Sequence, residues 1–151
     1  MATAPKTYTG GCHCGFLRYS FSWNPALSAT VFGKCNCTSC LSRGILILDI
    51  EPPSSFTLKS PTSLSDPQLG KYSPLGGSLH FHFCKNCGVN CFYQGGFEGE
   101  AEGIEYVRIN VLSLDPGQGI DFTRFKIEYW DGKNDNWEAG PKDEPWPGGC
   151  L

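Results

Sequence analysis

The feature that most constrains this chain is the clustering of its cysteines. Seven of the nine cysteines fall into three short motifs, in which neighbouring cysteines are one or two residues apart. The three motifs are Cys12-His13-Cys14, Cys35-Asn36-Cys37-Thr38-Ser39-Cys40 and Cys84-Lys85-Asn86-Cys87. Two cysteines this close can direct both sulfur atoms at one metal ion, whereas a disulfide between them would be strained. Seven ligands divide into a set of four and a set of three, which predicts two zinc ions per chain.

The two sets are expected to do different work. A zinc ion with four protein ligands is structural, whereas a zinc ion with three protein ligands keeps one position for water or substrate. Gly15 and Gly88 follow the first and third motifs, and glycine lets the backbone turn beneath a metal with its N–H groups facing sulfur. We therefore assign the structural zinc site to Cys12, Cys14, Cys84 and Cys87. The open site, where we expect catalysis, is assigned to Cys35, Cys37 and Cys40.

Other interpretations of these cysteines remain. Cys91 or His13 could supply a fourth ligand to the middle motif, or all the cysteines could stabilise the fold around one structural zinc ion. Cys91 lies in an alternating apolar stretch, which predicts a small core residue, and Cys150 is expected to be a free thiol or disordered. His80 and His82 share one face of a predicted strand, and we expect them at the surface or behind the metal ligands.

Composition narrows the class of partner. The chain of 151 residues is long enough for one domain with a buried core. Only 18% of its residues are charged and its net charge is −3, so neither nucleic acid nor a membrane is an expected partner. The longest aliphatic run, Ile45-Leu46-Ile47-Leu48, is too short to cross a bilayer. We see no secretory signal, and clustered thiols are typical of a reducing compartment, so the expected location is the cytoplasm.

Short β-branched and aromatic runs between Gly, Pro and Ser residues predict an all-β fold. The expected strands cover residues 16–21, 29–34, 45–50, 56–59, 69–72, 78–83, 90–93 and 104–110, with a last strand within 122–129. No segment shows a sustained helical pattern. We expect a single domain over residues 1–151, a β-sandwich whose strand ends are joined by zinc-binding Cys knuckles. Its core covers about residues 8–130, and a Trp- and Pro-rich extension, residues 131–151, wraps around it.

The order of the motifs resembles the family of glutathione-dependent formaldehyde-activating enzymes and centromere-protein-V-like proteins. The matching motifs are Gly11-Cys12-His13-Cys14-Gly15, Cys35-x-Cys37-x-x-Cys40 and Phe83-Cys84-x-x-Cys87-Gly88. The resemblance implies an Mss4-like fold, with the same structural and catalytic zinc ligands that the glycines suggest. The chain departs from the family pattern at Asn36, where histidine is frequent, and at Leu41-Ser42-Arg43-Gly44, where a basic pair and a glycine are usual.

The resemblance also implies a function. The family's reference reaction makes and breaks S-hydroxymethylglutathione from glutathione and formaldehyde, so the expected activity is that of a zinc-dependent carbon–sulfur lyase acting on a small-molecule thiol–aldehyde adduct. Zinc held by three thiolates suits a fourth sulfur and would lower the pKa of a bound thiol. Arg43 and Lys34 flank the open motif and are candidates for binding a substrate carboxylate. Two alternatives are a related zinc enzyme acting on a specialised metabolite and a non-catalytic zinc-binding module.

Overall fold

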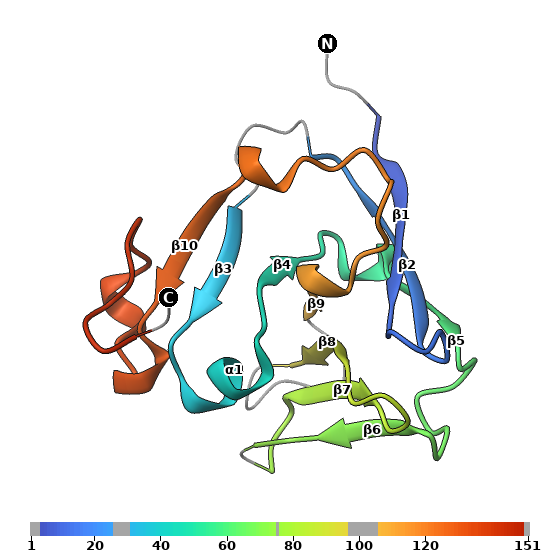
Figure 1. The fold of residues 1–151 in the computed structure, drawn as a ribbon. Coiled ribbons are helices and arrows are strands. Elements are labelled where there is room, and N and C mark those ends of the chain that lie inside the picture. The colour runs from blue at the N-terminus through green and yellow to red at the C-terminus, as the bar shows by residue number, and fades with distance from the viewer. Residues whose placement is uncertain (1–3, 26–30, 75, 97–105, 150–151) are drawn as a thin grey trace.

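The computed structural model describes residues 4–25, 31–74, 76–96 and 106–149 of the chain. Within these ranges the protein forms ten β-strands and one short α-helix (Figure 1). The predicted all-β fold is therefore confirmed. The strands belong to a larger and a smaller sheet, and buried side chains from both sheets meet in one core.

The elements are short, as expected for a chain punctuated by glycine and proline. The strands are β1 (Lys6–Gly11), β2 (Arg18–Trp23), β3 (Val31–Cys35), β4 (Ile47–Asp49), β5 (Thr57–Ser60), β6 (Leu69–Tyr72), β7 (His80–Cys84), β8 (Asn90–Gly95), β9 (Tyr106–Asn110) and β10 (Lys126–Trp130). The helix is α1 (Thr38–Arg43), and the 3-10 turns are η1 (Pro53–Ser55), η2 (Val111–Ser113), η3 (Phe122–Arg124), η4 (Gly132–Asn134) and η5 (Trp137–Ala139).

The larger sheet has the strand order β10-β3-β4-β9-β8-β7-β6, and the smaller sheet has the order β1-β2-β5. Neighbouring strands are antiparallel except for β10 and β3, which run parallel with Trp130 opposite Cys35. This parallel pairing brings the end of β10 next to the first cysteine of the middle motif. A segment near the C-terminus is thus placed beside a candidate metal centre.

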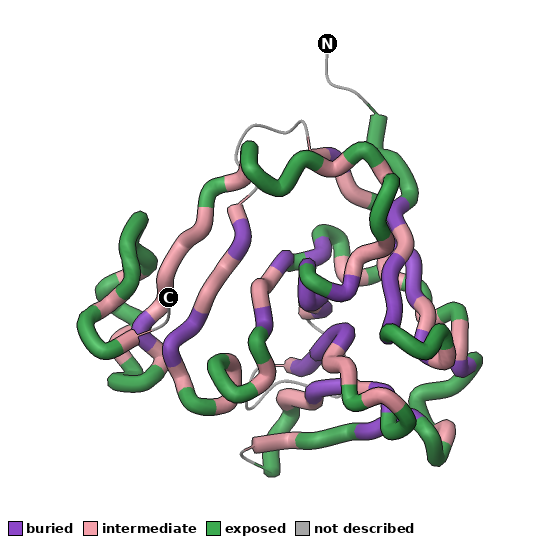
Figure 2. The backbone as a smooth tube through the Cα atoms, viewed as in Figure 1, coloured by how far each residue is buried: buried purple, intermediate pink, exposed green. Residues whose placement is uncertain are grey.

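Aromatic side chains join the two sheets. Phe56 lies between Tyr19 of β2 and Phe92 of β8, with ring centroids 5.5 Å from Tyr19 and 4.8 Å from Phe92. Tyr19 is 1% exposed and Phe92 is 2% exposed, and burial of each such side chain stabilises the fold by about 1.5–3 kcal/mol. Figure 2 shows that buried residues concentrate in the strands, whereas the connecting turns are mostly exposed.

Two differences from the sequence prediction have physical causes. β1 was not predicted, because Lys6 and its two glycines weaken the β signal of the Thr and Tyr residues between them, and it forms by pairing with β2. His82, expected at the surface or behind the metal ligands, is buried at 1% exposure and stacks on Phe92 with centroids 4.7 Å apart. The register of β7 against β8 shifts between His82 and Phe83, and a bulge of this kind breaks the strict alternation of faces. Of the two positions expected for His82, the surface is therefore wrong.

The extension after β10 packs against that strand (Figure 1). The backbone of Lys142, in the extension, forms a β-bridge with the backbone of Tyr129 in β10. The Trp146 indole Nε1 donates a hydrogen bond to the Tyr129 carbonyl oxygen at 2.9 Å. Cys150 and the first residues of two expected strands, Ala29 and Ile104, lie outside the described residues. In the part of the chain that the structure describes, no helix is long and apolar enough to span a bilayer.

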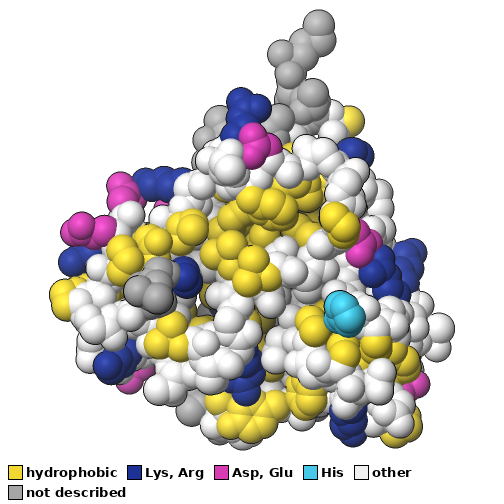
Figure 3. All heavy atoms as spheres, viewed as in Figure 1, with side chains coloured by type: hydrophobic (Ala, Val, Ile, Leu, Met, Phe, Trp, Pro, Cys, Tyr) yellow, Lys and Arg dark blue, Asp and Glu magenta, His cyan; other side chains and the backbone are white. Residues whose placement is uncertain are grey.

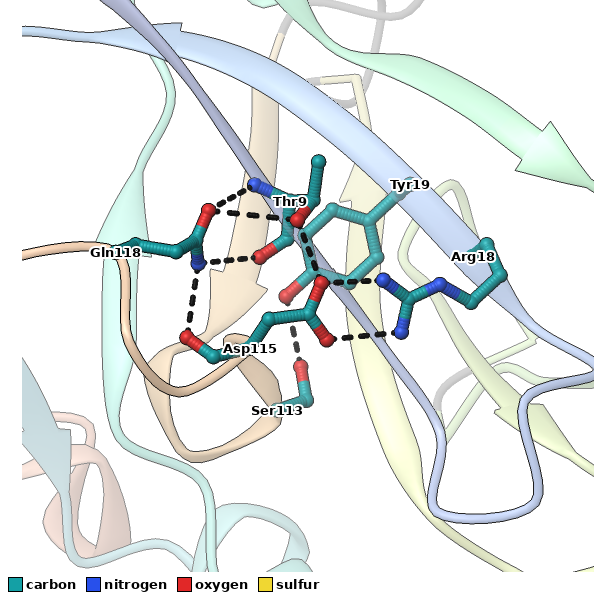
Figure 4. Close-up of polar contacts among 6 residues, drawn as sticks. All are labelled: Thr9, Arg18, Tyr19, Ser113, Asp115 and Gln118. Atoms are coloured by element: carbon teal, nitrogen blue, oxygen red, sulfur yellow. Dashed lines mark hydrogen bonds and ion pairs between the residues drawn. The ribbon is translucent and has the colours of Figure 1, made fainter.

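A polar network ties the small sheet to the segment after β9 (Figure 4). The Arg18 guanidinium binds both carboxylate oxygens of Asp115, with Nη1 to Oδ1 at 2.8 Å, and Thr9 Oγ1 donates to the same carboxylate. The Gln118 side-chain amide bonds the backbone N–H and carbonyl of Thr9, both at 2.8 Å. These bonds satisfy backbone groups of β1, an edge strand that would otherwise be open to pairing.

Replacing Asp115 with asparagine is expected to lower the free energy of unfolding by about 1–2 kcal/mol, because a charge-assisted pair is lost from a position roughly a third exposed. The hydrogen bond from Arg18 lowers the pKa of the Asp115 carboxyl from its ordinary 3.8. Its contribution is therefore present above that value, and the loss should be the same at about pH 6 and pH 8. Urea unfolding at both pH values measures it. Asp143→Asn, which removes an exposed ion pair with Lys126, is the control and should change stability by less than about 0.5 kcal/mol.

Candidate metal centres and pocket

The first and third cysteine motifs meet between the β1–β2 and β7–β8 connections. The sulfur atoms that lie within 4.8 Å of one another are those of Cys12, Cys14, Cys84 and Cys87. The Cys14 sulfur is 3.6 Å from that of Cys12 and 3.5 Å from that of Cys84. A tetrahedral zinc ion with Zn–S bonds of about 2.3 Å separates its sulfur ligands by about 3.8 Å. The spacing of this group therefore fits a zinc ion with four sulfur ligands.

Local backbone geometry explains how this group forms. Gly15 and Gly88 have φ angles of 84° and 78°, in the left-handed region that favours glycine. The Leu17 N–H donates to the Cys12 sulfur at 3.2 Å, as is usual for thiolates in zinc knuckles. Hydrogen bonding by Asn86 and by the Phe16 backbone lowers the pKa of the Cys14 thiol to about 6. The thiolate needed for metal binding is thus available near neutral pH.

The middle motif forms a second group of sulfurs at the junction of β3 and α1. Cys35 ends β3, Cys37 caps the N-terminus of α1, and Cys40 lies in its first turn, with all three sulfurs within 4.8 Å of one another. The Cys37 N–H points to the Cys35 sulfur at 3.5 Å, and the Cys40 N–H to the Cys37 sulfur at 3.4 Å. Hydrogen bonds from Cys35 and then Cys40 lower the pKa of the Cys37 thiol. These three soft donors fit a thiophilic metal such as zinc.

The two residues considered as a fourth ligand do not reach this second group. His13 is exposed beside the first motif. Cys91 is buried at 0% exposure in the core, with its sulfur 3.7 Å from the Val89 carbonyl oxygen. Among the described residues, no further cysteine, histidine or carboxylate joins the three sulfurs. A metal ion held there would keep a coordination position for a ligand from solution.

A pocket of about 880 Å³ opens beside the three sulfurs. Part of its wall is apolar and aromatic, formed by Ile47, Leu79, Phe81, Tyr106 and Trp137. Such a volume is in the range of small-molecule sites. On the face drawn in Figure 3, hydrophobic side chains gather near the middle and charged side chains are scattered, with no broad basic surface over the described residues. The concave site therefore suits a small molecule.

Four charged side chains line the pocket, namely Arg43, Asp49, Arg108 and Asp135. Arg43 of α1 lies over the Phe81 ring at 4.5 Å and the Tyr72 ring at 4.8 Å, and its Nη1 donates to the Ser39 carbonyl and hydroxyl oxygens at 2.7 Å each. Arg108 of β9 lies 4.8 Å over the Tyr106 ring and forms an ion pair with Asp49 of β4. Lys34, the other residue expected to bind substrate, does not line this pocket.

Sequence reasoning missed Arg108 and Asp49. Each looks like an ordinary charged residue in a short strand, and only the pairing of β4 with β9 places them opposite each other. That pairing joins segments about sixty residues apart, so no local spacing points to it. The one signal in the sequence was that Arg108, a charged residue, stands between the apolar residues Val107 and Ile109.

Comparison with known proteins agrees with this geometry. The sequence model of the glutathione-dependent formaldehyde-activating enzymes matches residues 7–123, a span that contains all seven clustered cysteines. The chain belongs to this enzyme family. The crystal structure of a Rhodobacter sphaeroides protein is similar in fold, with a TM-score of 0.55 and 20% identity over 81% of this chain and 98% of that chain.

The match to the glutathione-dependent formaldehyde-activating enzyme family ends before β10. Trp130, Gly132, Asp135 and Trp137 nevertheless line the pocket beside the middle motif. Part of the pocket wall is thus built from residues outside the matched span.

Proposed function

We propose that this protein is a zinc-dependent carbon–sulfur lyase that forms and breaks adducts between a glutathione-type thiol and an aldehyde. The observation that carries the proposal is the group of three sulfurs, from Cys35, Cys37 and Cys40, which faces a small-molecule pocket without a fourth ligand among the described residues. Membership of a formaldehyde-activating enzyme family supports the same reaction class. In this proposal the closed group of four cysteines is structural.

The residues of the open group hold and prepare the metal. Zinc bound there would supply a position at which a substrate thiol loses its proton near neutral pH. The three cysteines would bind it as thiolates, and the N–H groups of Cys37 and Cys40 would stabilise the negative charge on sulfur. The apolar wall formed by Phe81 and Ile47 limits access of water to the adduct carbon. In this proposal the protein therefore positions the substrate, surrounds it with an apolar wall and supplies soft ligands for the metal.

Three of the four charged side chains of the pocket complement the charges of glutathione. At neutral pH glutathione carries two carboxylates and one ammonium group, and the pocket presents Arg43, Arg108 and Asp49, with Asp135 as a second carboxylate. The adjacent Arg108 and Asp49 suit the carboxylate and ammonium groups of its α-amino acid end. Arg43, next to the open group, suits the second carboxylate. Stacking on aromatic rings orients both guanidinium groups before substrate arrives.

Two measurements on zinc-loaded protein test the proposed function. Calorimetric titration with glutathione should show binding at a single site. Exchange spectroscopy by NMR with carbon-13 formaldehyde and glutathione should show faster interconversion of free and adduct carbon than in buffer alone. Absence of both binding and acceleration in protein that holds two zinc ions would reject the activity and leave a zinc-binding module.

One observation favours the alternative of a related zinc enzyme acting on a specialised metabolite. Trp130 and Trp137 line the pocket from outside the span matched by the family, so the electrophile accepted here need not be the smallest aldehyde. Repeating the exchange experiment with larger aldehydes separates the two functions. A higher kcat/KM for a larger aldehyde than for formaldehyde would favour the alternative.

Arg108→Gln and Arg43→Gln are each expected to raise the KM for glutathione about tenfold or more, with a smaller change in kcat. Each removes a charge-assisted hydrogen bond of about 1.5–3 kcal/mol from a bound carboxylate. Steady-state kinetics at saturating aldehyde measures the effect. Arg124→Gln, an exposed arginine on η3 away from the pocket, is the matched control. Equal KM values for the pocket variants and this control would remove Arg43 and Arg108 from substrate binding.

A further inference from the structure

The strand pairing places two polar residues side by side at the open group. β10 runs parallel to β3 with Trp130 opposite Cys35, and the Asn36 N–H extends the ladder by donating to the Trp130 carbonyl oxygen at 3.1 Å. Asn36 follows Cys35 in the chain and Asp131 follows Trp130. The side chain between two cysteines of the open group is therefore held beside the first residue of the extension.

We propose that Asn36 and Asp131 form a positioning lock, through which the extension after β10 sets the geometry and the metal retention of the open group. Asn36 is 1% exposed, and its Nδ2 donates to the Asp131 Oδ1 at 2.7 Å. Its Oδ1 accepts the Lys133 backbone N–H at 2.8 Å. Both ends of the amide are thus bonded to the extension, so its orientation is fixed.

Asp131 is itself held firmly. It is 4% exposed, and its carboxylate also accepts hydrogen bonds from Asn134 Nδ2 at 3.0 and 3.1 Å and from Asn136 Nδ2 at 3.4 Å. A buried carboxylate costs free energy unless it is fully hydrogen-bonded, so this arrangement is stable only as a unit. The lock therefore fixes the backbone of residue 36 relative to the turn after β10. The sulfurs of Cys35 and Cys37, on either side of residue 36, are positioned with it.

The extension also contacts the sulfur directly. A Cβ atom on Gly132 would lie 2.5 Å from the Cys35 sulfur and 2.7 Å from the Trp137 ring, so only glycine fits between them. Trp137 lines the pocket next to this contact. The extension is thus a wall of the open group. This inference goes beyond the proposed function, because it concerns metal retention and requires no particular substrate.

The test follows release of zinc from fully loaded protein to an excess of a chromophoric chelator. Two phases are expected, a fast one from the open group and a slow one from the closed group. Asn36→Ala and the milder Asp131→Asn should each speed the fast phase about 10- to 100-fold, as is typical when a residue supporting a metal ligand is lost. The slow phase should stay near the wild-type value, while the thermal midpoint should fall by several degrees, because each change leaves a buried polar group without its partner. With cobalt in place of zinc, the visible bands of the open group should shift.

Two further variants separate positioning from general loosening. Trp146→Phe removes a hydrogen bond of the extension to Tyr129 without touching the lock, and it should leave the fast phase unchanged. The exchange Asn36→Asp with Asp131→Asn restores an amide–carboxylate pair and should return the rate most of the way to wild type. The proposal is overturned if Asn36→Ala and Asp131→Asn change the fast phase less than twofold, if they speed both phases equally, or if the exchange gives no recovery.

Discussion

Replacing Cys37 with alanine is expected to abolish turnover while the fold is retained. Only two sulfurs of the open group would remain, and two ligands do not hold a zinc ion tightly. Activity should fall to below about 1% of wild type, because the proposed chemistry depends on a metal at this position. Bound zinc should fall from two ions per chain to one.

The fold should survive because Cys37 contributes little to the core. It is half-buried at the N-terminus of a six-residue helix and is not part of either hydrophobic cluster. The thermal midpoint should therefore stay within a few degrees of wild type, measured by circular dichroism. Cys91→Ala is the matched control, since it removes a cysteine that belongs to neither group; it should keep both zinc ions and the activity. Two tightly bound zinc ions in the Cys37 variant would contradict the assignment.

Whether a feature of this protein can be predicted from the sequence depends on how far apart in the chain the residues that determine it lie. The cysteine motifs are local, and Gly15 and Gly88 mark the turns that direct their sulfurs inward, so the grouping found in the structure was expected. That each group holds zinc, and that the middle one is catalytic, stays a prediction. Both ends of β6 were predicted correctly because turn residues lie directly before and after this strand. The helix α1 was missed because six residues are too few to show a helical pattern.

The polar contacts around the open group that the sequence did not reveal depend on pairing between distant segments. Asp49 and Arg108 meet only because β4 pairs with β9, and Asn36 meets Asp131 only because β10 runs parallel to β3. Asn36 looked like a departure from the family pattern rather than a contact. We expected the extension to pack against the core through its tryptophans. Nothing in the local sequence indicated the polar contacts between the extension and the open group. The grouping of the cysteines could thus be predicted, whereas the pocket beside the open group could not.

Replacing Cys87 with alanine is expected to have the opposite effect from the Cys37 substitution and to destabilise the whole protein. Its group joins the β1–β2 connection of the small sheet to the β7–β8 connection of the large sheet. A structural zinc ion contributes its binding free energy to folding, and even a loss of about 5 kcal/mol is comparable to the total stability of a domain. For a chain of this length such a loss lowers the thermal midpoint by roughly 10–20 °C, so the variant should be recovered largely as aggregate.

The comparison of the two cysteine variants tests the division of labour between the groups. Each removes one sulfur from a candidate metal site, which leaves three sulfurs in the closed group and two in the open group, and the comparison measures what each site supports. A chelator titration of wild-type protein gives the same contrast without mutation, because loss of the first zinc ion should end activity and loss of the second should unfold the sheets. If Cys37→Ala and Cys87→Ala show the same midpoint and the same solubility, the open group is as structural as the closed one. In that case the pocket beside the open group needs another explanation, since a metal that only stabilises the fold does not require access for a substrate.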